Sequence, residues 1–348
     1  MEATWLYYLD EKGQLYCNDA KKVLENSTLF PDESVDMAIT SPPYWALRDY
    51  HADGQLGQEP LFKDYICNLV GYFDIVYRIL KPEGTLWVNI GDTYYGSGKG
   101  AGGTGAASRK QLTNKGSNYR SNKGNKESDL ENASNFNNHE LPERSLCQIP
   151  ARFSIEMQNR GWILRNDLIW HKPNQMPSSA RNRFSVDYEH LYFFTKKTKD
   201  YYFEQQLEAY TAPMNRWGGV ELKAINESAW DADTGQESYR DRNMRPNPKG
   251  RNKRSVWSIN TQPMRGSNHF AKYPEKLIET PILAGCPEGG TVLDIFFGSG
   301  TTGIVAERLN RKWIGVELNP DYCGHSIDRI LSKRKKEAWH TESNAVNV

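Results

Sequence analysis

Apolar residues recur along this chain in short runs that alternate between a strand-like period and a helix-like period. Strand-like runs occupy residues 13–19, 35–40, 84–92, 291–297 and 312–318, and helix-like spacing occupies 20–27, 62–80, 144–161, 273–285 and 302–310. Two further apolar stretches, 162–170 and 189–196, follow the third helix-like segment. Strands that alternate with helices predict an α/β fold, in which helices cover both faces of a largely parallel sheet.

Two segments interrupt this alternation and divide the chain. Residues 93–140 are rich in Gly, Ser, Asn and Lys and nearly free of aliphatic side chains, which predicts a long flexible basic loop. Residues 200–268 carry scattered Trp and Tyr among polar residues, which predicts an insertion with its own smaller structure. The expected divisions are therefore 1–92, 93–140, 141–199, 200–268 and 269–348.

Composition excludes several classes of protein. The chain has 348 residues, of which 38% are hydrophobic, enough for a full core. No stretch approaches the ~20 consecutive apolar residues of a membrane span, and the first residues lack a signal pattern, so we expect a soluble intracellular protein without a membrane partner. The five cysteines form no C-x-x-C pair, so neither a metal site nor a disulfide framework is expected.

The glycine-rich segment DIFFGSGTTG follows a strand-like run and opens a helix-like one. Gly298, Gly300 and Gly303 permit a tight turn and close approach of a ligand to the free N–H groups of a helix N-terminus. Asp294 ends the first strand and Glu317 ends the next, where a carboxylate can accept hydrogen bonds from ribose hydroxyls. These residues fit a dinucleotide-dependent oxidoreductase, a nucleoside cofactor such as S-adenosylmethionine, or a plain strand-to-helix turn.

The segment SPPYW comes directly after the run 35–40, so we expect it at the carboxyl edge of the sheet, where α/β folds bind ligands. Pro42 and Pro43 fix the backbone and lack N–H groups, which leaves their carbonyls free to accept hydrogen bonds. Ser41 adds a hydroxyl, and Tyr44 and Trp45 add flat faces suited to stacking on a base. The simpler alternative is a proline-rich turn with aromatic packing.

SPPYW and DIFFGSG together resemble the motif pair of the amino-DNA methyltransferases, which methylate exocyclic amines of cytosine or adenine. The catalytic motif of that family reads S/D/N-P-P-Y/F and its cofactor motif D-x-F-x-G-x-G. Here the catalytic motif comes first and the cofactor motif about 250 residues later, the order of the permuted beta group. The resemblance covers most of residues 13–330. It implies a Rossmann-like sheet with an inserted target-recognition region, S-adenosylmethionine as cofactor, double-stranded DNA as substrate, and a cytoplasmic protein of a prokaryote or phage, in some cases with a cognate restriction endonuclease.

The same resemblance assigns roles to residues and segments. Catalysis would use Ser41, Pro42, Pro43 and Tyr44. The cofactor would be bound by Asp19, His269, Phe270, Asp294, Phe296, Gly298, Gly300, Thr301, Thr302 and Glu317. The target base or DNA would be contacted by Trp45, Trp170, Lys172, Asn174, Arg251, Lys253 and Arg254. No metal is implied. For some of these residues a simpler role stands beside the functional one: His269 and Asp19 as caps, and Trp170 as core packing.

In this scheme residues 1–92 form the catalytic-motif half, 141–199 continue the methyltransferase domain, 200–268 recognise the target, and 269–348 form the cofactor half. The formal net charge of +1 conceals two basic segments. Residues 99–126 contain seven Lys and Arg and no acid, and residues 240–265 contain eight against one acid, so the rest of the chain is acidic. We expect these segments to hold DNA by its phosphates and guanine edges, although both also fit solvated loops.

The chemistry expected is direct transfer to a flipped-out base. The chain has no Pro-Cys dipeptide, which disfavours attack on carbon 5 of cytosine. Serine as first residue of the catalytic motif indicates the N4 amine of cytosine, with the N6 amine of adenine as the alternative. An oxidoreductase would leave SPPYW and the basic segments unexplained, and the intact motif disfavours a DNA-binding protein without activity.

Overall fold

The computed structural model describes residues 5–47, 52, 54–95, 141–142, 144–209, 249–262 and 273–345, with side chains of the last helix described as far as Lys336. His269, Phe270, nearly all of the 93–140 segment and much of the 240–265 segment lie outside the described residues. The chain divides into two compact units, Met1–Phe203 with Val256–Val348, and Glu204–Ser255.

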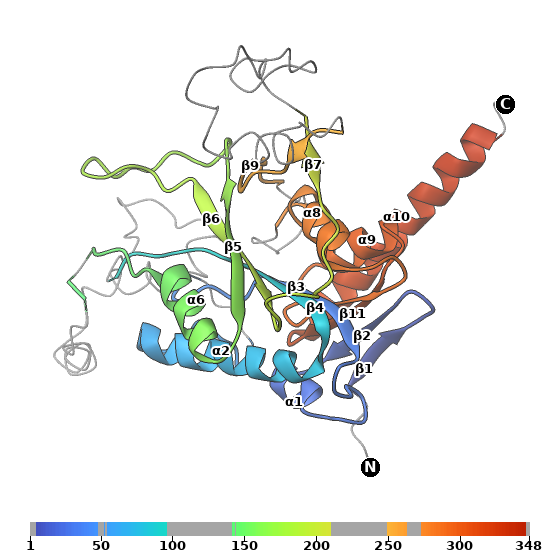
Figure 1. Cartoon of the computed structure of the whole chain (residues 1–348), viewed down its shortest axis with the longest axis horizontal. Coiled ribbons are helices and arrows are strands. Elements are labelled where there is room, and N and C mark those ends of the chain that lie inside the picture. Colours follow the sequence, from blue (N-terminus) through green and yellow to red (C-terminus); the bar gives the residue numbers. More distant parts are fainter. Residues whose placement is uncertain are drawn as a thin grey trace, which may run out of the picture. The chain divides into compact units, whose positions relative to one another are not determined.

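A nine-stranded sheet forms the centre of the first unit, in the order β1-β2-β11-β10-β3-β4-β6-β5-β9 (Figure 1). The strands are β1 Leu6–Leu9, β2 Gly13–Cys17, β3 Val35–Thr40, β4 Leu80–Ile90, β5 Ile163–His171, β6 Tyr188–Thr195, β9 Val256–Ser258, β10 Thr291–Asp294 and β11 Lys312–Glu317. The five central strands β2, β11, β10, β3 and β4 are parallel to one another. The predicted α/β fold is therefore confirmed.

Two strands depart from the parallel arrangement. β6 is antiparallel to both β4 and β5, and β1 is antiparallel to β2. A parallel neighbour requires a crossover connection, usually a helix, whereas β6 follows β5 after residues 172–187 without one. The short edge strand β1 and the long last helix, α10, were not anticipated from the sequence pattern.

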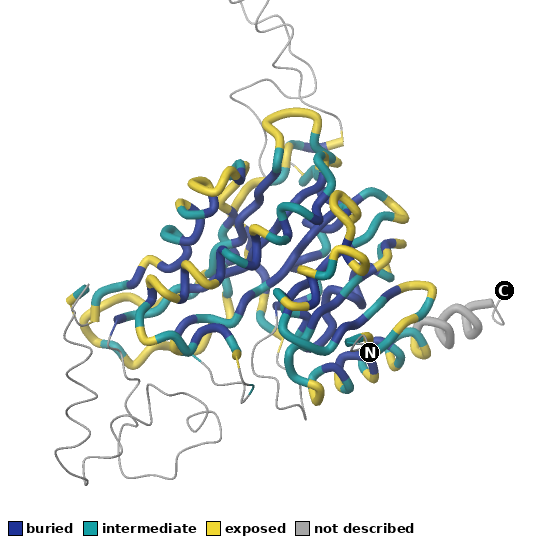
Figure 2. Tube along the Cα trace, turned by 90° about the horizontal axis from the view of Figure 1, so that it is seen from below, coloured by how far each residue is buried: buried dark blue, intermediate teal, exposed yellow. Residues whose placement is uncertain are grey.

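Helices cover both faces of the sheet. α1 (Ala20–Leu24), α2 (Phe62–Ile79) and α6 (Ile149–Asn159) lie on one face, and α8 (Glu275–Gly285), α9 (Thr301–Arg308) and α10 (Pro320–Ala345) on the other (Figure 1). Side chains alternate between the faces along each strand, so Ala38 packs with the first group and its neighbours Met37 and Ile39 with the second. Figure 2 shows the resulting buried interior beneath the exposed outer turns.

The long helix α2 illustrates how the sequence determines an element. Its buried residues recur at helical spacing, from Phe62 and Tyr65 to Val76 and Ile79. Asp64 in its first turn and Arg78 in its last turn complement the helix dipole. The helix ends at Ile79, close to the predicted end, and β4 starts at Leu80, four residues earlier than the run 84–92 predicted.

The second unit contains a small two-stranded sheet, in which β7 (Leu207–Glu208) pairs antiparallel with β8 (Arg251–Asn252). Residues 210–248, between these strands, lie outside the described part of the chain. Within the described residues of the protein, no helix has the length and apolar character that crossing a membrane requires.

Candidate active site

The carboxyl ends of β2, β11, β10, β3 and β4 meet at one edge of the sheet, because these strands are parallel. A cavity opens at this edge and is lined by residues from both motifs, among them Ser41 and Pro43 after β3, and Phe296 and Gly298 after β10. Glu317 at the end of β11 lines the same cavity. The two motifs are far apart in sequence but share one site, because they follow adjacent parallel strands, β3 and β10.

Asp294 joins the two motifs from inside the protein. Its Oδ1 accepts hydrogen bonds from Thr40 Oγ1 (2.6 Å) and from the Phe296 N–H (3.1 Å). Its Oδ2 accepts from Tyr273 OH (3.0 Å) and from Thr302 Oγ1 (2.5 Å). Burial, the largest influence, raises the pKa of this carboxyl above its ordinary value. Asp294 and Thr302 are thus buried, and their hydrogen bonds hold together the segments that line the cavity. We call Asp294 and its hydrogen bonds the brace.

The backbone of the glycine-rich turn adopts a conformation that is strained for residues other than glycine. Gly298 and Gly300 have φ angles of 52° and 73°, in the left-handed region. Arg329 supports the turn from α10 by donating hydrogen bonds to the Ser299 carbonyl (2.8 Å) and to Thr301 Oγ1 (2.9 Å). Thr301 is buried and engaged by this arginine, whereas Gly298 faces the cavity.

Glu317 presents a carboxylate to the cavity. Its Oε2 accepts from the Gly298 N–H (2.8 Å) and its Oε1 from the Asn319 N–H (2.9 Å). Although part of the residue is exposed, the carboxyl group is surrounded by protein, and this burial raises its pKa to about 7 against the opposing backbone hydrogen bonds. A carboxylate here can accept hydrogen bonds from two vicinal hydroxyls.

Asp19 and the aromatic pair Tyr72 and Phe296 also line the cavity. Asp19 caps α1 by accepting from the Lys22 N–H (3.2 Å), and its Oδ2 accepts from Tyr72 OH (2.8 Å). The Tyr72 ring lies 5.4 Å from the Phe296 ring, centroid to centroid. Two carboxylates and flat apolar faces suit a nucleoside. Tyr72 was not anticipated from the sequence, because it lies on α2, outside both motifs.

Tyr44 of the SPPYW motif is held at its hydroxyl. The hydroxyl donates to Glu189 Oε2 (2.6 Å), and Glu189 forms an ion pair with Lys172. The Tyr44 ring packs on Gly91, where an added Cβ would stand 2.7 Å from a ring carbon. Burial, and then the Glu189 charge, raise the pKa of Tyr44 well above its ordinary value, so it remains a donor.

Glu189 was not predicted as a site residue, although one signal was present in the sequence. It is a charged residue at the start of the apolar run EHLYFFT, at the edge where β6 begins. Its side chain is 15% exposed and that of Lys172 is 12% exposed. Lys172 also lies over the Trp170 ring, 4.6 Å from the centroid. In the structure Lys172 is therefore the ion-pair partner of Glu189, which in turn binds the Tyr44 hydroxyl.

Five other predicted residues lie in or beside the loops around this edge. Trp45 is buried, and its Nε1 donates to the Glu59 carbonyl (2.8 Å). Trp170 is buried, and its Nε1 donates to the Ile259 carbonyl (2.8 Å). Asn174 Oδ1 accepts from the Thr261 N–H (2.8 Å), and Pro42 is buried. The Pro43 carbonyl accepts a hydrogen bond from Tyr65 (2.8 Å).

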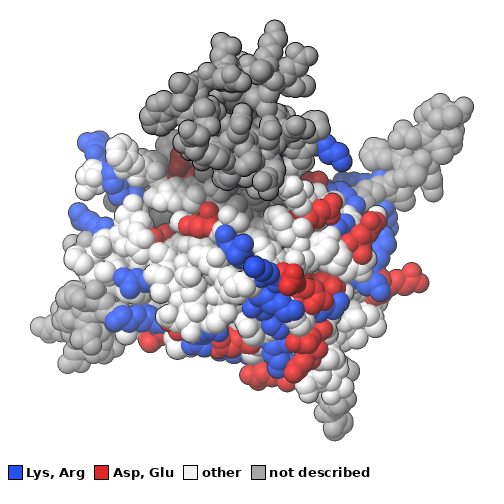
Figure 3. Space-filling view, in the orientation of Figure 1, with Lys and Arg blue, Asp and Glu red and all other residues white. Residues whose placement is uncertain are grey.

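The basic residues predicted to bind DNA are described only in part. Within the second unit, Arg251 and Arg254 both donate to Glu208 Oε1, at 2.9 and 2.7 Å, and the Lys253 N–H donates to the Gln206 carbonyl (3.0 Å). Segment 99–126 lies outside the described residues. On the face that Figure 3 shows, basic and acidic side chains are intermixed.

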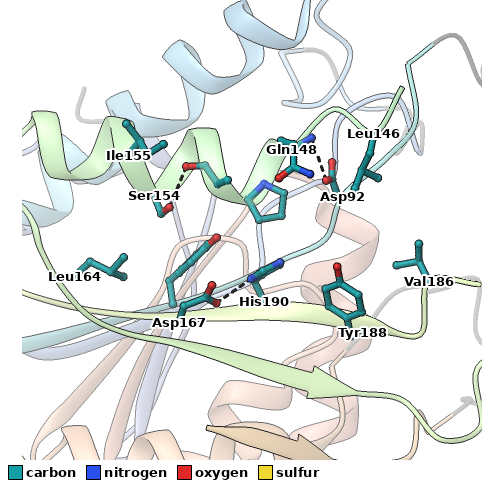
Figure 4. Close-up of a pocket in the computed structure, with 13 residues that line it drawn as sticks. Asp92, Leu146, Gln148, Ser154, Ile155, Leu164, Asp167, Val186, Tyr188 and His190 are labelled. Atoms are coloured by element: carbon teal, nitrogen blue, oxygen red, sulfur yellow. Dashed lines mark hydrogen bonds and ion pairs between the residues drawn. The ribbon is translucent and has the colours of Figure 1, made fainter. Parts of the chain in front are cut away.

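A second cavity lies beside the end of β4, between α6 and strands β5 and β6 (Figure 4). Asp92 accepts hydrogen bonds from the N–H groups of Gln148 and Ile149 (3.0 Å each) at the start of α6. His190 Nδ1 lies 2.8 Å from Asp167 Oδ1 across the strands. Asp92, Asp167 and His190 in the lining of this cavity are thus hydrogen-bonded, and no motif in the sequence indicates the cavity.

The fold and site place an S-P-P-Y motif beside a cavity suited to a nucleoside, at the carboxyl edge of a Rossmann-like α/β sheet. Residues 35–328 match the family described as DNA methylase, and the chain belongs to that family. Enzymes of this family are S-adenosylmethionine-dependent, so the expected cofactor is confirmed and the oxidoreductase alternative is removed.

Two relatives align with nearly the whole chain. The Type II methyltransferase M.SmaI of Serratia marcescens is 36% identical over 323 residues, covering 92% of this chain and 91% of the relative. M.Cfr9I of Citrobacter freundii is 34% identical over 322 residues, covering 91% and 87%. The solved PvuII DNA methyltransferase, described as cytosine-N4-specific, has a TM-score of 0.58 at 21% identity, covering 93% of this chain and 88% of its own; it supports the fold.

Proposed function

We propose that this DNA methyltransferase transfers the methyl group of S-adenosylmethionine to the N4 amine of cytosine in double-stranded DNA. The observation that carries the proposal is Ser41, the first residue of the catalytic motif, which lines the cofactor cavity together with Glu317. Two further findings agree with it. The relatives are named Type II methyltransferases, and a solved protein with this fold is described as cytosine-N4-specific.

The exocyclic amine is a poor nucleophile, because its lone pair is delocalised into the ring. The Ser41 hydroxyl and the Pro42 carbonyl would accept hydrogen bonds from the amine hydrogens and favour a pyramidal nitrogen. The bound cofactor supplies a methyl group on a positively charged sulfur. Much of the rate enhancement then comes from holding the amine in line with that methyl group, and no covalent intermediate with the protein is needed.

The target base has to leave the duplex to reach Ser41. Tyr44 would provide the face on which the flipped base stacks, and its hydroxyl bond to Glu189 fixes the ring plane. Tyr44→Ala and Ser41→Ala should each lose most of the methyl transfer while cofactor affinity stays near the wild-type value. A turnover rate unchanged in both variants would refute these roles.

The decisive test is chemical identification of the product. Plasmid DNA is methylated with the purified protein, digested to nucleosides and analysed by mass, and sequencing of the same DNA gives the recognised site. We expect N4-methylcytosine. N6-methyladenine alone would overturn the cytosine assignment in favour of the adenine alternative, and DNA without any added methyl group would overturn the proposed activity.

We further assign target recognition to residues 200–268, which include the second unit, Glu204–Ser255. Arg251, Lys253 and Arg254 lie in this unit and supply cations of the kind that contact phosphates and guanine edges. Alanine at Lys253 should weaken binding to all sequences and reduce the salt dependence by about one unit of slope. A cognate restriction endonuclease that cuts the unmethylated site completes the proposal, and methylated plasmid should resist such an enzyme.

A further inference from the structure

The most exposed large apolar side chain among the described residues lies on the connection between β5 and β6. The β5–β6 arm, residues 172–187, connects the two strands at the carboxyl edge and projects beyond them in Figure 1. Phe184 on this arm is 96% exposed, and Met176 is 79% exposed. Burying side chains of this size is favourable in free energy, so Phe184 and Met176 can contribute to the binding of a partner.

The arm is folded and anchored. The Lys172 N–H donates to the Asp187 carbonyl (2.7 Å) at its base, and the Ser178 N–H donates to Ser185 Oγ (3.3 Å) across it. Arg183 stacks over the Tyr94 ring, 3.9 Å from the centroid, which ties the arm to the segment after β4. These contacts position the arm and leave Phe184 in solvent.

The charge and place of the arm identify the partner. The arm carries three basic residues, Lys172, Arg181 and Arg183, against one acid, Asp187 at its base. This net positive charge fits a polyanion. Its base begins at Lys172, whose partner Glu189 holds Tyr44 of the catalytic motif. DNA that delivers a base to Ser41 and Tyr44 must approach this edge of the sheet.

We propose that the β5–β6 arm is a DNA-contacting element in which Phe184 inserts into the base stack next to the flipped nucleotide, while Arg181 contacts a phosphate. The inference rests on the proposed DNA-methylating function but holds for either target base. Removing a base from a duplex leaves a gap in the stack, and a flat apolar side chain that fills the gap favours the flipped state. Met176 adds apolar surface on the other limb of the arm.

The test uses the full chain and a duplex containing the sequence that the wild-type protein methylates. Phe184→Ala should weaken binding by about 5- to 150-fold, the range for one base–aromatic stack. It should also reduce the fluorescence increase of 2-aminopurine placed next to the target base, with cofactor affinity unchanged. Arg181→Ala should lower the slope of log affinity against log salt by about one. Phe184 is exposed, so its variant should fold normally.

The matched control is Leu9→Ala, which truncates an apolar side chain 58% exposed on β1, at the opposite end of the sheet order. This control should bind and flip DNA like the wild type. The inference would be overturned if Phe184→Ala bound DNA and raised the 2-aminopurine signal within twofold of the wild type. It would also be overturned if the variant lost cofactor affinity by the same factor as DNA affinity. A wild-type protein that binds DNA but adds no methyl group would instead overturn the proposed function. The affinities of the wild type and Phe184→Ala, measured on a duplex that the wild type binds, would then still decide whether Phe184 contacts DNA.

Discussion

Acidification from pH 8 to pH 6 is expected to weaken cofactor binding about tenfold through protonation of Glu317. Its carboxylate lines the cavity, and burial raises its pKa to about 7. Ribose hydroxyls donate best to an ionised carboxylate, so the protonated protein should bind the cofactor less well. For one group of this pKa that must be ionised, the dissociation constant rises by about a factor of ten over these two pH units.

The assay is titration calorimetry of S-adenosylmethionine from pH 5.5 to 8.5 at constant ionic strength, on the wild type and Glu317→Gln. The variant should bind more weakly at pH 8 and lose this pH dependence. The amino group of the cofactor titrates in both experiments, so the difference between the two profiles isolates Glu317. Parallel profiles for wild type and variant would refute the reasoning.

The same carboxyl group should affect folding in the opposite direction. Its folded pKa of about 7 lies above the ordinary value of 4.5, so the folded state holds the proton more tightly than the unfolded state. Its contribution to the free energy of unfolding therefore falls as pH rises from about 4.5 to 7, by up to about 3 kcal/mol. Glu317→Gln should therefore raise Tm at pH 8, although it weakens cofactor binding. Many active sites show this opposition between stability and function. An unchanged or lower Tm would contradict the prediction.

Three substitutions test the contacts around the cavity. Glu189→Gln removes the charged acceptor of the Tyr44 hydroxyl, a bond of about 1.5–3 kcal/mol, and should reduce kcat with cofactor affinity unchanged; Asp36→Asn, another paired carboxylate whose side chain is 14% exposed, is the control and should keep kcat. Gly91→Ala places a Cβ 2.7 Å from the Tyr44 ring. It should mainly lower the rate of methyl transfer, with only a small fall in Tm. Asp294→Asn leaves buried hydroxyl donors poorly paired and should destabilise the protein by about 1–3 kcal/mol, measured by urea unfolding; unchanged unfolding would show that the brace is dispensable.

The apolar pattern predicted most of the sheet and its helices, because the helices bury one face and the central strands, covered on both faces, form short apolar runs. β3, β10 and β11 were predicted within a few residues for this reason, and the glycine-rich turn followed from its motif. The last helix, α10, was missed because its sequence is strongly polar along most of its length. The antiparallel direction of β6 depends on the connection before it, which periodicity along the strand does not report.

Within the candidate site, sequence predicted which segments meet but not what each side chain contacts. Asp294 lies in the cofactor motif, yet its partners Thr40 and Tyr273 come from other elements, and these contacts decide that it serves as a brace. The burial of Trp45 and Trp170 likewise depends on acceptors 14 and 89 residues away. Long-range packing of this kind has no local signature in a single sequence.

The order of the two motifs along the chain has little effect on the chemistry, because the sheet determines their distance. β3 and β10 are parallel neighbours, so the loops that follow them emerge side by side whichever strand comes first in sequence. The hydrogen bond from Thr40 to Asp294 spans 254 residues of chain and fixes this adjacency at the strand ends. Permutation therefore alters only the connections between elements, while Ser41 and Glu317 face the same cavity.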